Sequence, residues 1–158
     1  MDLRLIYAII LTILPVTELR VGLPLAVSYA IKENVPVFPI FLLIVLLNIL
    51  LIFFIFFFLD YIHRHLIIIS TYKKMFNLYL KSMQRKIESL ENKHGSLVFV
   101  MLFIFVAIPL PGTGAYTGCL LAWILGLERK KSIVSIALGV IVAGLIVFGL
   151  SLGILKGL

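Results

Sequence analysis

The chain has 158 residues, 63% of them hydrophobic, with a mean hydropathy of +1.22 and a net charge of +7. This composition excludes an ordinary soluble domain and predicts an all-α integral membrane protein, with residues 1–158 as one membrane domain. In a membrane protein the excess of 14 basic over 7 acidic residues follows from the positive-inside rule, so we expect a lipid bilayer and no nucleic acid as partner.

The first apolar stretch is interrupted near its middle. Two short apolar runs flank a segment that contains Pro15, Gly22 and Pro24. Neither run is long enough to span a bilayer at about 1.5 Å per residue. We therefore expect residues 1–34 to form a re-entrant hairpin, two helices that enter the membrane and return on the same side. Pro24 is expected in the first turn of its second helix, where a missing N–H costs nothing.

Two long uncharged stretches predict full transmembrane helices. Residues 35–59 and 132–155 carry no charged side chain and are long enough to span a bilayer with slight tilt. Asn48 is strongly polar, and we expect it to make a hydrogen bond between helices. The second stretch is rich in glycine and other small residues, which allow close helix contact.

Residues 60–95 form a long polar segment between these features. Their apolar side chains recur at steps of three, four or seven, which is typical of an amphipathic helix with a basic opposite face. Such a helix either lies on an anionic leaflet or pairs with a second copy as a short coiled coil. The recurring apolar positions are Ile62, Leu66, Ile69, Phe76, Leu80, Met83, Ile87 and Leu90.

Residues 96–127 contain no charged side chain, yet they do not suit a single helix. As one helix these 32 residues would be about 48 Å long, against a hydrocarbon core of about 30 Å. Their centre, from Pro109 to Gly118, reads Pro-Leu-Pro-Gly-Thr-Gly-Ala-Tyr-Thr-Gly. Broken backbone lies at membrane depth only when it is packed in protein or lines a wet cavity. We therefore expect a second re-entrant hairpin with its tip at these ten residues.

The two tips carry the candidate chemistry. A helix that starts at a membrane tip directs unpaired N–H groups and a positive dipole end at an anionic group such as phosphate. Thr113 is expected to cap the helix that follows, Arg20 to bind phosphate through its planar fork, and Glu18 to carry a proton. The expected substrate- or proton-binding residues are Glu18, Arg20, Gly112, Thr113, Gly114, Tyr116 and Thr117. The residues expected to shape the tips are Pro15, Gly22, Pro24, Pro109, Pro111 and Gly118.

Two simpler interpretations of the tips stay open. In the first, Glu18 and Arg20 neutralise each other and only hold the tips together. In the second, the prolines and glycines bend plain spanning helices.

The order of hairpin followed by spanning helix occurs twice, which is the pattern of inverted repeats in transporters. With re-entrant hairpins, ten basic residues fall on the side of residues 60–95 and three on the other; with four spanning stretches the split is nine to four. Both arrangements place residues 60–95 in the cytoplasm, and the first agrees better with the positive-inside rule. We expect a multi-pass protein of the plasma membrane, whose first hairpin enters from outside and whose second enters from the cytoplasm.

The runs from Glu18 to Pro24 (Glu-Leu-Arg-Val-Gly-Leu-Pro) and from Pro109 to Gly118 resemble the two signature motifs of the small multidrug export protein family of bacteria and archaea. The resemblance covers essentially the whole chain. That family in turn resembles the DedA/VTT membrane proteins, which implies two inverted re-entrant hairpins with spanning helices. Members of the wider group are implicated in moving polyprenyl-phosphate carriers or other lipids across bilayers, with acidic and arginine residues in the hairpins.

Glu18 and Arg20 match that wider pattern in the first hairpin. Residues 96–127 contain no arginine or acid, so a mechanism with an arginine in each hairpin is not implied for this chain.

These observations predict a DedA-like transporter that moves a lipid-linked phosphate or a similar amphipathic anion, a lipid flippase coupled to protons or another gradient. The first alternative is an exporter of small hydrophobic cations, in which Glu18 is the binding charge and Arg20 an obstacle. The second is a membrane scaffold that transports nothing and whose connector binds partners or anionic lipid. Sensitivity to Arg20 distinguishes the first two.

No nucleophile with a base partner is visible, so we expect no enzyme, and we expect no cofactor. Cys119 reads as a small apolar filler, and its spacing to the histidines suggests no metal site. We expect a homodimer, because two hairpins and two spanning helices scarcely shield the broken backbone from lipid.

Overall fold

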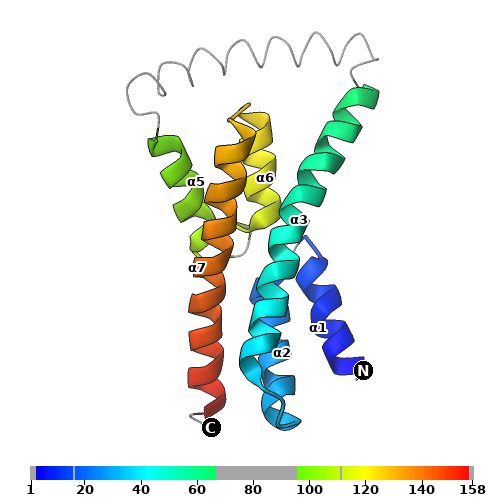
Figure 1. The fold of residues 1–158 in the computed structure, drawn as a ribbon, viewed down its shortest axis with the longest axis vertical. Coiled ribbons are helices and arrows are strands. Elements are labelled where there is room, and N and C mark those ends of the chain that lie inside the picture. The colour runs from blue at the N-terminus through cyan, green and yellow to red at the C-terminus, as the bar shows by residue number, and fades with distance from the viewer. Residues whose placement is uncertain (1–2, 16, 67–95, 111, 157–158) are drawn as a thin grey trace.

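The computed structural model describes residues 3–15, 17–66, 96–110 and 112–156. Most of the expected connector and Pro111 lie outside the described residues. In the part that is described, all regular structure is α-helical, as predicted (Figure 1). The helices are α1 (Leu3–Ile13), α2 (Glu18–Lys32), α3 (Val37–Leu66), α5 (Leu97–Ala107), α6 (Ala115–Ile124) and α7 (Arg129–Lys156).

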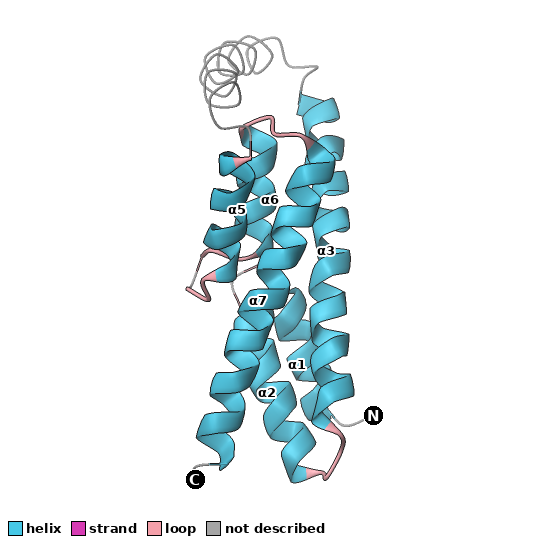
Figure 2. Cartoon of the chain, turned by 60° about the vertical axis from the view of Figure 1, so that its left-hand side comes forward, coloured by secondary structure: helices cyan, strands magenta, loops and turns pink. Residues whose placement is uncertain are grey.

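Helices α3 and α7 run the length of the molecule (Figures 1 and 2). They have 30 and 28 residues, or about 45 and 42 Å at about 1.5 Å per residue. Their segments Val37–His63 and Arg129–Ile154 are long and apolar enough to cross a bilayer. Helix α3 continues beyond the predicted end at residue 59, and the carboxylate of Asp60 in this extension is bound by side chains of α6 and α7.

The four shorter helices form two hairpins, one beside each half of the long helices (Figure 1). Helices α1 and α2 pack against each other and against α3, and α2 also contacts α7. In the other hairpin, α5 packs along α7, and α6 contacts both α3 and α7. The turns of both hairpins lie near the middle of the molecule, where the two hairpins meet (Figures 1 and 2).

The break in the first hairpin is shorter than predicted. Helix α2 already begins at Glu18, so Gly22 and Pro24 lie inside it, and the expectation that Pro24 starts the helix is wrong. Pro24 removes one backbone hydrogen bond, to the carbonyl of Arg20 four residues earlier. Gly22 lies directly against α1, since a Cβ at this position would overlap Thr12. Close contact between α1 and α2 therefore needs glycine there.

The second hairpin breaks within the predicted segment but over fewer residues. Helix α5 ends at Ala107, and α6 begins at Ala115. Gly118 was expected at the tip, but it is buried inside α6. A Cβ at Gly118 would lie 2.7 Å from Val106, so this glycine serves the packing of α6 against α5.

The core lies where the hairpins pack against the long helices. Its large side chains with no more than 1% exposure include Leu23, Val27, Ile44, Ile52, Val106 and Ile136. The outer face of α3, by contrast, exposes a row of phenylalanines, Phe53, Phe54, Phe57 and Phe58. A continuous apolar exterior of this kind suits lipid rather than water.

Candidate functional site

Glu18 joins the two hairpins at the centre of the molecule. It is the first residue of α2 and is 5% exposed. Its Oε2 accepts a hydrogen bond from the backbone N–H of Ala115 (3.2 Å), and its Oε1 accepts one from that of Tyr116 (3.1 Å). These are the first two residues of α6. The carboxylate therefore caps a helix of the opposite hairpin.

The charge of helix ends explains this position. The first four N–H groups of a helix have no partner within it, and its N-terminus carries about half a positive charge. Lipid offers no acceptor for such groups at membrane depth. Glu18 lies at the start of its own helix as well as at the start of α6, so that one negative charge faces two positive helix ends.

The backbone of Glu18 is strained. Its φ is +45°, in the left-handed region, which costs a residue with a side chain about 1–2 kcal/mol. The hydrogen bonds of its carboxylate offset this cost. Strain of this kind gathers at functional sites, where a side chain must be held in one direction.

Arg20 lies beside Glu18 and reaches the other hairpin as well. Its Nη1 is 3.3 Å from Glu18 Oε2, in an ion pair whose side chains are 13% and 6% exposed. Its Nη2 donates to Thr113 Oγ1 (2.8 Å) and, over a longer distance, to the carbonyl of Ile108 (3.4 Å). Its Nε is buried and has no hydrogen-bond acceptor among the described residues. The guanidinium is thus held by both hairpins and incompletely satisfied.

Thr113 makes hydrogen bonds with Arg20 and within the turn, and it does not cap the helix that follows. Its hydroxyl lies 2.7 Å from the carbonyl of Ile108 and 2.9 Å from that of Leu110, to one of which it donates, and it accepts from Arg20. The expectation that Thr113 caps α6 is therefore wrong. Gly114 occupies the N-cap position without a side chain, and the carboxylate of Glu18 does the capping.

Two glycines make this approach possible. Gly112 has a φ of +87°, which glycine adopts without cost and which turns the chain toward α6. A Cβ on Gly114 would overlap the carboxylate of Glu18. Glycine at position 114 therefore admits a side chain of the protein itself, and its contact with a substrate stays a prediction.

The remaining predicted residues divide between the site and its surroundings. The hydroxyl of Tyr116 donates to the carbonyl of Ile13 (2.6 Å) and so links α6 to the end of α1. Thr117 donates to the carbonyl of Gly114 within its own helix (3.2 Å) and does not take part in the cluster. Pro15 lies exposed in the first turn, and Pro109 is partly buried in the second.

Asn48 of α3 belongs to this site, although its hydrogen bond differs from the expected one. Its amide donates to the carbonyl of Ile44 in the same helix (3.0 Å), not to another helix. It is 1% exposed and, with Glu18 and Arg20, lines a cavity of about 10 Å³, roughly the space for one water molecule. In the sequence, the signal for a role of Asn48 was that it is a strongly polar residue isolated in an apolar stretch.

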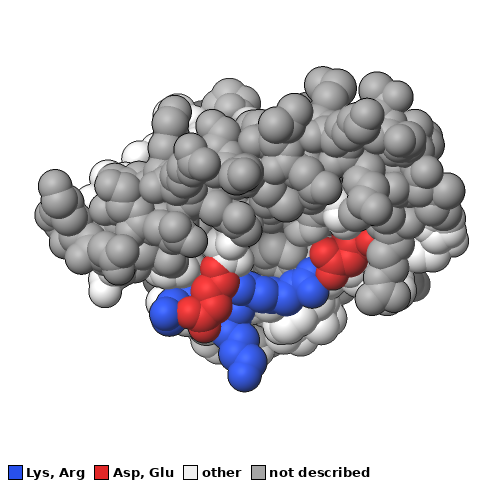
Figure 3. Space-filling model, turned by 90° about the horizontal axis from the view of Figure 1, so that it is seen from above, with Lys and Arg blue, Asp and Glu red and all other residues white. Residues whose placement is uncertain are grey.

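A second charged cluster holds three helices together at one end of the molecule, and the sequence analysis missed it. Asp60 of α3 accepts hydrogen bonds from Trp123 Nε1 of α6 (3.0 Å) and from Arg129 Nη2 of α7 (2.6 Å). Arg129 also donates to the carbonyl of Phe56 (3.2 Å). Acidic and basic side chains alternate along this end (Figure 3).

Both clusters consist of an ion pair and of hydrogen bonds between distant segments of the chain. Among the described residues, no group of three or more His, Cys, Asp and Glu side chains is placed to hold a metal ion. The central cluster contains one acid, one base and several backbone groups. Its hydrogen bonds connect the two hairpins.

The two threonines of the second tip provide a matched test of this geometry. Thr113→Val removes the acceptor of Arg20, so we expect it to lower the free energy of unfolding by about 1–3 kcal/mol, since a buried donor loses its partner. Thr117→Val makes the same change of side chain but removes only a hydrogen bond within α6. It should therefore change the free energy of unfolding by less than about 0.5 kcal/mol. Unfolding in detergent measures both, and equal losses would contradict the assigned contacts.

Comparison with known proteins agrees with the membrane character of the helices. No curated protein and no solved structure matches the chain, so the likeness to DedA proteins stays an expectation. A family model named "Putative small multi-drug export protein" matches residues 18–146, which include Glu18, Arg20, the turn of the second hairpin and most of the chain. With two helices long and apolar enough to span a bilayer, this match identifies a membrane protein. The chain belongs to the small multidrug export protein family.

Proposed function

We propose that the protein is a membrane exporter of small hydrophobic cations, and that a substrate cation replaces Arg20 on the carboxylate of Glu18. One observation carries the proposal. A single carboxylate, buried at the junction of the two hairpins, accepts hydrogen bonds from the start of α6 and pairs with Arg20 of α2. Whatever binds this carboxylate therefore acts on both hairpins at once.

The bonds of Arg20 suit such an exchange. Its contact with Glu18 is 3.3 Å long, whereas its contact with Thr113 is 2.8 Å. Arg20 thus keeps its better partner, and the carbonyl of Ile108, when it leaves the carboxylate. A cation that takes its place keeps the buried carboxylate neutralised, which membrane depth requires.

Coupling to protons follows from the same group. A proton on Glu18 would cancel the charge that holds the cation and would release it. The start of α6 would then lose its capping charge, which favours movement of the second hairpin relative to the first. Proton-driven export is accordingly part of the proposal.

The proposed topology has both hairpins re-entrant and inverted relative to each other. Its support is that each hairpin lies beside only half the length of α3 and α7, and that the turns meet at mid-height (Figure 1). Arg129, Lys130 and Lys131 lie at the end where α3 leads into residues 67–95, and Lys32 lies at the opposite end. By the positive-inside rule the first end, with the connector, is cytoplasmic, and the membrane is the plasma membrane.

A homodimer is part of this proposal. Leu110 is 56% exposed in the second turn, and Pro15 and Gly112 are exposed as well. Irregular backbone at mid-membrane depth needs protein or a wet cavity beside it, because lipid cannot satisfy its polar groups. A second copy of the chain against these turns supplies that cover.

A second candidate substrate is an amphipathic anion such as a lipid-linked phosphate. Arg20 has a buried Nε without an acceptor, and it borders a groove of about 350 Å³ whose other lining residues are mostly apolar. A phosphate at the guanidinium with its lipid chain along this groove would use both features. The groove is lined further by Pro24, Pro109, Val147, Leu150, Ser151 and Ile154.

Substitution of Arg20 distinguishes the two substrates. In proteoliposomes, Arg20→Gln removes the internal competitor, so a fluorescent hydrophobic cation should bind about fivefold tighter, the equivalent of about 1 kcal/mol. Glu18→Gln should abolish binding of the cation, and Glu33→Gln, which changes an exposed acid outside the cluster, should change nothing. If Arg20→Gln and Arg20→Lys instead abolish movement of a lipid phosphate while cation binding stays unchanged, the anion is the substrate.

Single cysteines in a Cys119→Ser background test the topology and the dimer together. We expect an impermeant thiol reagent to label position 32 only from outside and position 130 only from the cytoplasm. A cysteine at position 110 should form a disulfide with its copy in native membranes. Labelling of position 130 from outside would mean that all four apolar stretches span, and no crosslink at position 110 would exclude a dimer across these turns.

A further inference from the structure

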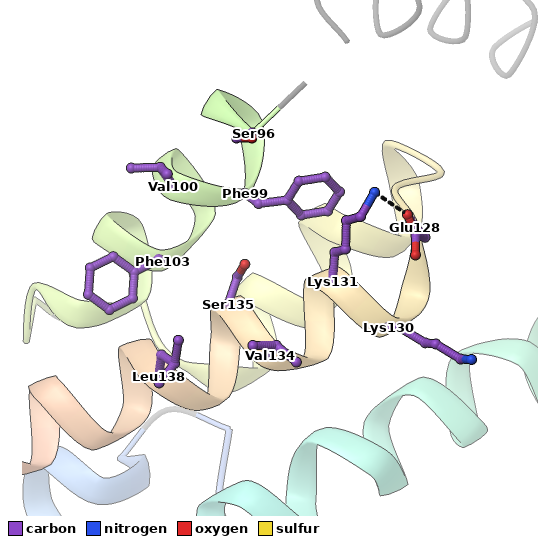
Figure 4. Close-up of a pocket in the computed structure, with 10 residues that line it drawn as sticks. All are labelled: Ser96, Phe99, Val100, Phe103, Glu128, Lys130, Lys131, Val134, Ser135 and Leu138. Atoms are coloured by element: carbon purple, nitrogen blue, oxygen red, sulfur yellow. Dashed lines mark ion pairs between the residues drawn. The ribbon is translucent and has the colours of Figure 1, made fainter. Parts of the chain in front are cut away.

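A large open groove lies between α5 and α7, at the charged end of the molecule and apart from the central cluster. Its volume is about 970 Å³ (Figure 4). The part nearest the charged end is lined by Ser96, Glu128, Lys130 and Lys131. The remaining wall is apolar apart from Ser135 and consists of Phe99, Val100, Phe103, Val134 and Leu138.

We infer that this groove binds an anionic phospholipid, with its phosphate at Lys131 and one acyl chain along the apolar wall. The order of its lining residues matches the order of a lipid. Charged groups lie at the start of α7, and from Lys131 to Leu138 the helix descends about 10 Å into the apolar part of the molecule. In a bilayer an open apolar groove of this size is filled by lipid, so the headgroup decides which lipid stays.

The charges at the head end favour an anion. The head end of the groove carries two lysines and one glutamate. Lys131 extends between Phe99 and Glu128, and Lys130 points toward α3 (Figure 4). Lys131 Nζ lies 5.6 Å from the ring centre of Phe99, which holds the ammonium group above the apolar wall. Basic pockets between membrane helices on the cytoplasmic side are the usual binding sites of anionic lipid headgroups.

The ion pair of Lys131 does not prevent this binding. Lys131 Nζ lies 2.6 Å from Glu128 Oε2, but the two side chains are 61% and 50% exposed. Exposed ion pairs contribute little to stability, so a phosphate can share the ammonium group or displace Glu128 at small cost. The hydroxyls of Ser96 and Ser135 are further donors for phosphate oxygens.

The inference is tested by counting bound lipids with native mass spectrometry. Purified protein is titrated with phosphatidylglycerol and phosphatidylcholine of identical acyl chains. We expect a preference for phosphatidylglycerol, and we expect Lys131→Gln to reduce it about fivefold, the effect of one lysine near a lipid surface. Lys131→Arg should retain the preference. Lys32→Gln, which removes an exposed lysine at the opposite end, serves as the matched control and should leave the preference unchanged.

A second variant tests the apolar wall. Val100→Trp fills the groove, so it should weaken binding of both lipids while the headgroup preference of the remaining bound lipid persists. Circular dichroism in detergent checks that each variant folds. The inference is overturned if wild-type protein binds the two lipids equally, if Lys131→Gln and Lys32→Gln behave alike, or if Val100→Trp leaves binding unchanged.

Discussion

The structure depends on one carboxylate that faces two helix N-termini. Helices α2 and α6 both start near the centre of the molecule, so the positive ends of two helix dipoles lie there. Glu18 begins the first helix, accepts hydrogen bonds from the first two residues of the second, and pairs with Arg20. At membrane depth no lipid group would replace these contacts. Loss of the negative charge would therefore leave two positive helix ends and a guanidinium unbalanced at the junction of the hairpins.

The two charged clusters differ in how completely their polar groups are paired. A purely structural ion pair is most stable when every polar atom of both side chains has a hydrogen-bond partner. Arg20, however, lies 3.3 Å from Glu18, and its own Nε has no acceptor among the described residues. Asp60 and Arg129 form the opposite case, since their 2.6 Å contact is reinforced by Trp123 and ties three helices at one end. The end cluster is thus more completely paired but half-exposed, whereas the central pair is buried and incompletely satisfied.

The sequence predicted where the chain breaks but not which groups meet there. Paired Pro and Gly clusters in uncharged stretches marked both turns, and charges in an apolar stretch marked Glu18 and Arg20. The rules for helix caps are local, and they favoured Thr113, which lies two residues before α6. The actual cap is Glu18, 97 residues from Ala115, and only the packing of the two hairpins brings it there. Asp60 was likewise predicted to start the connector. Its partners lie on other helices, so the residues around it in the sequence do not show them.

The double variant Glu18→Gln with Arg20→Gln tests the central claim most directly. Its export of a hydrophobic cation from proteoliposomes is measured and compared with that of each single variant. The double change removes both buried charges together, so thermal stability should recover relative to Glu18→Gln. Our account predicts that export does not recover, because no charge is left to hold the cation or to take a proton. Export restored to the wild-type rate would show that Glu18 and Arg20 are a structural ion pair, and it would contradict the proposed mechanism.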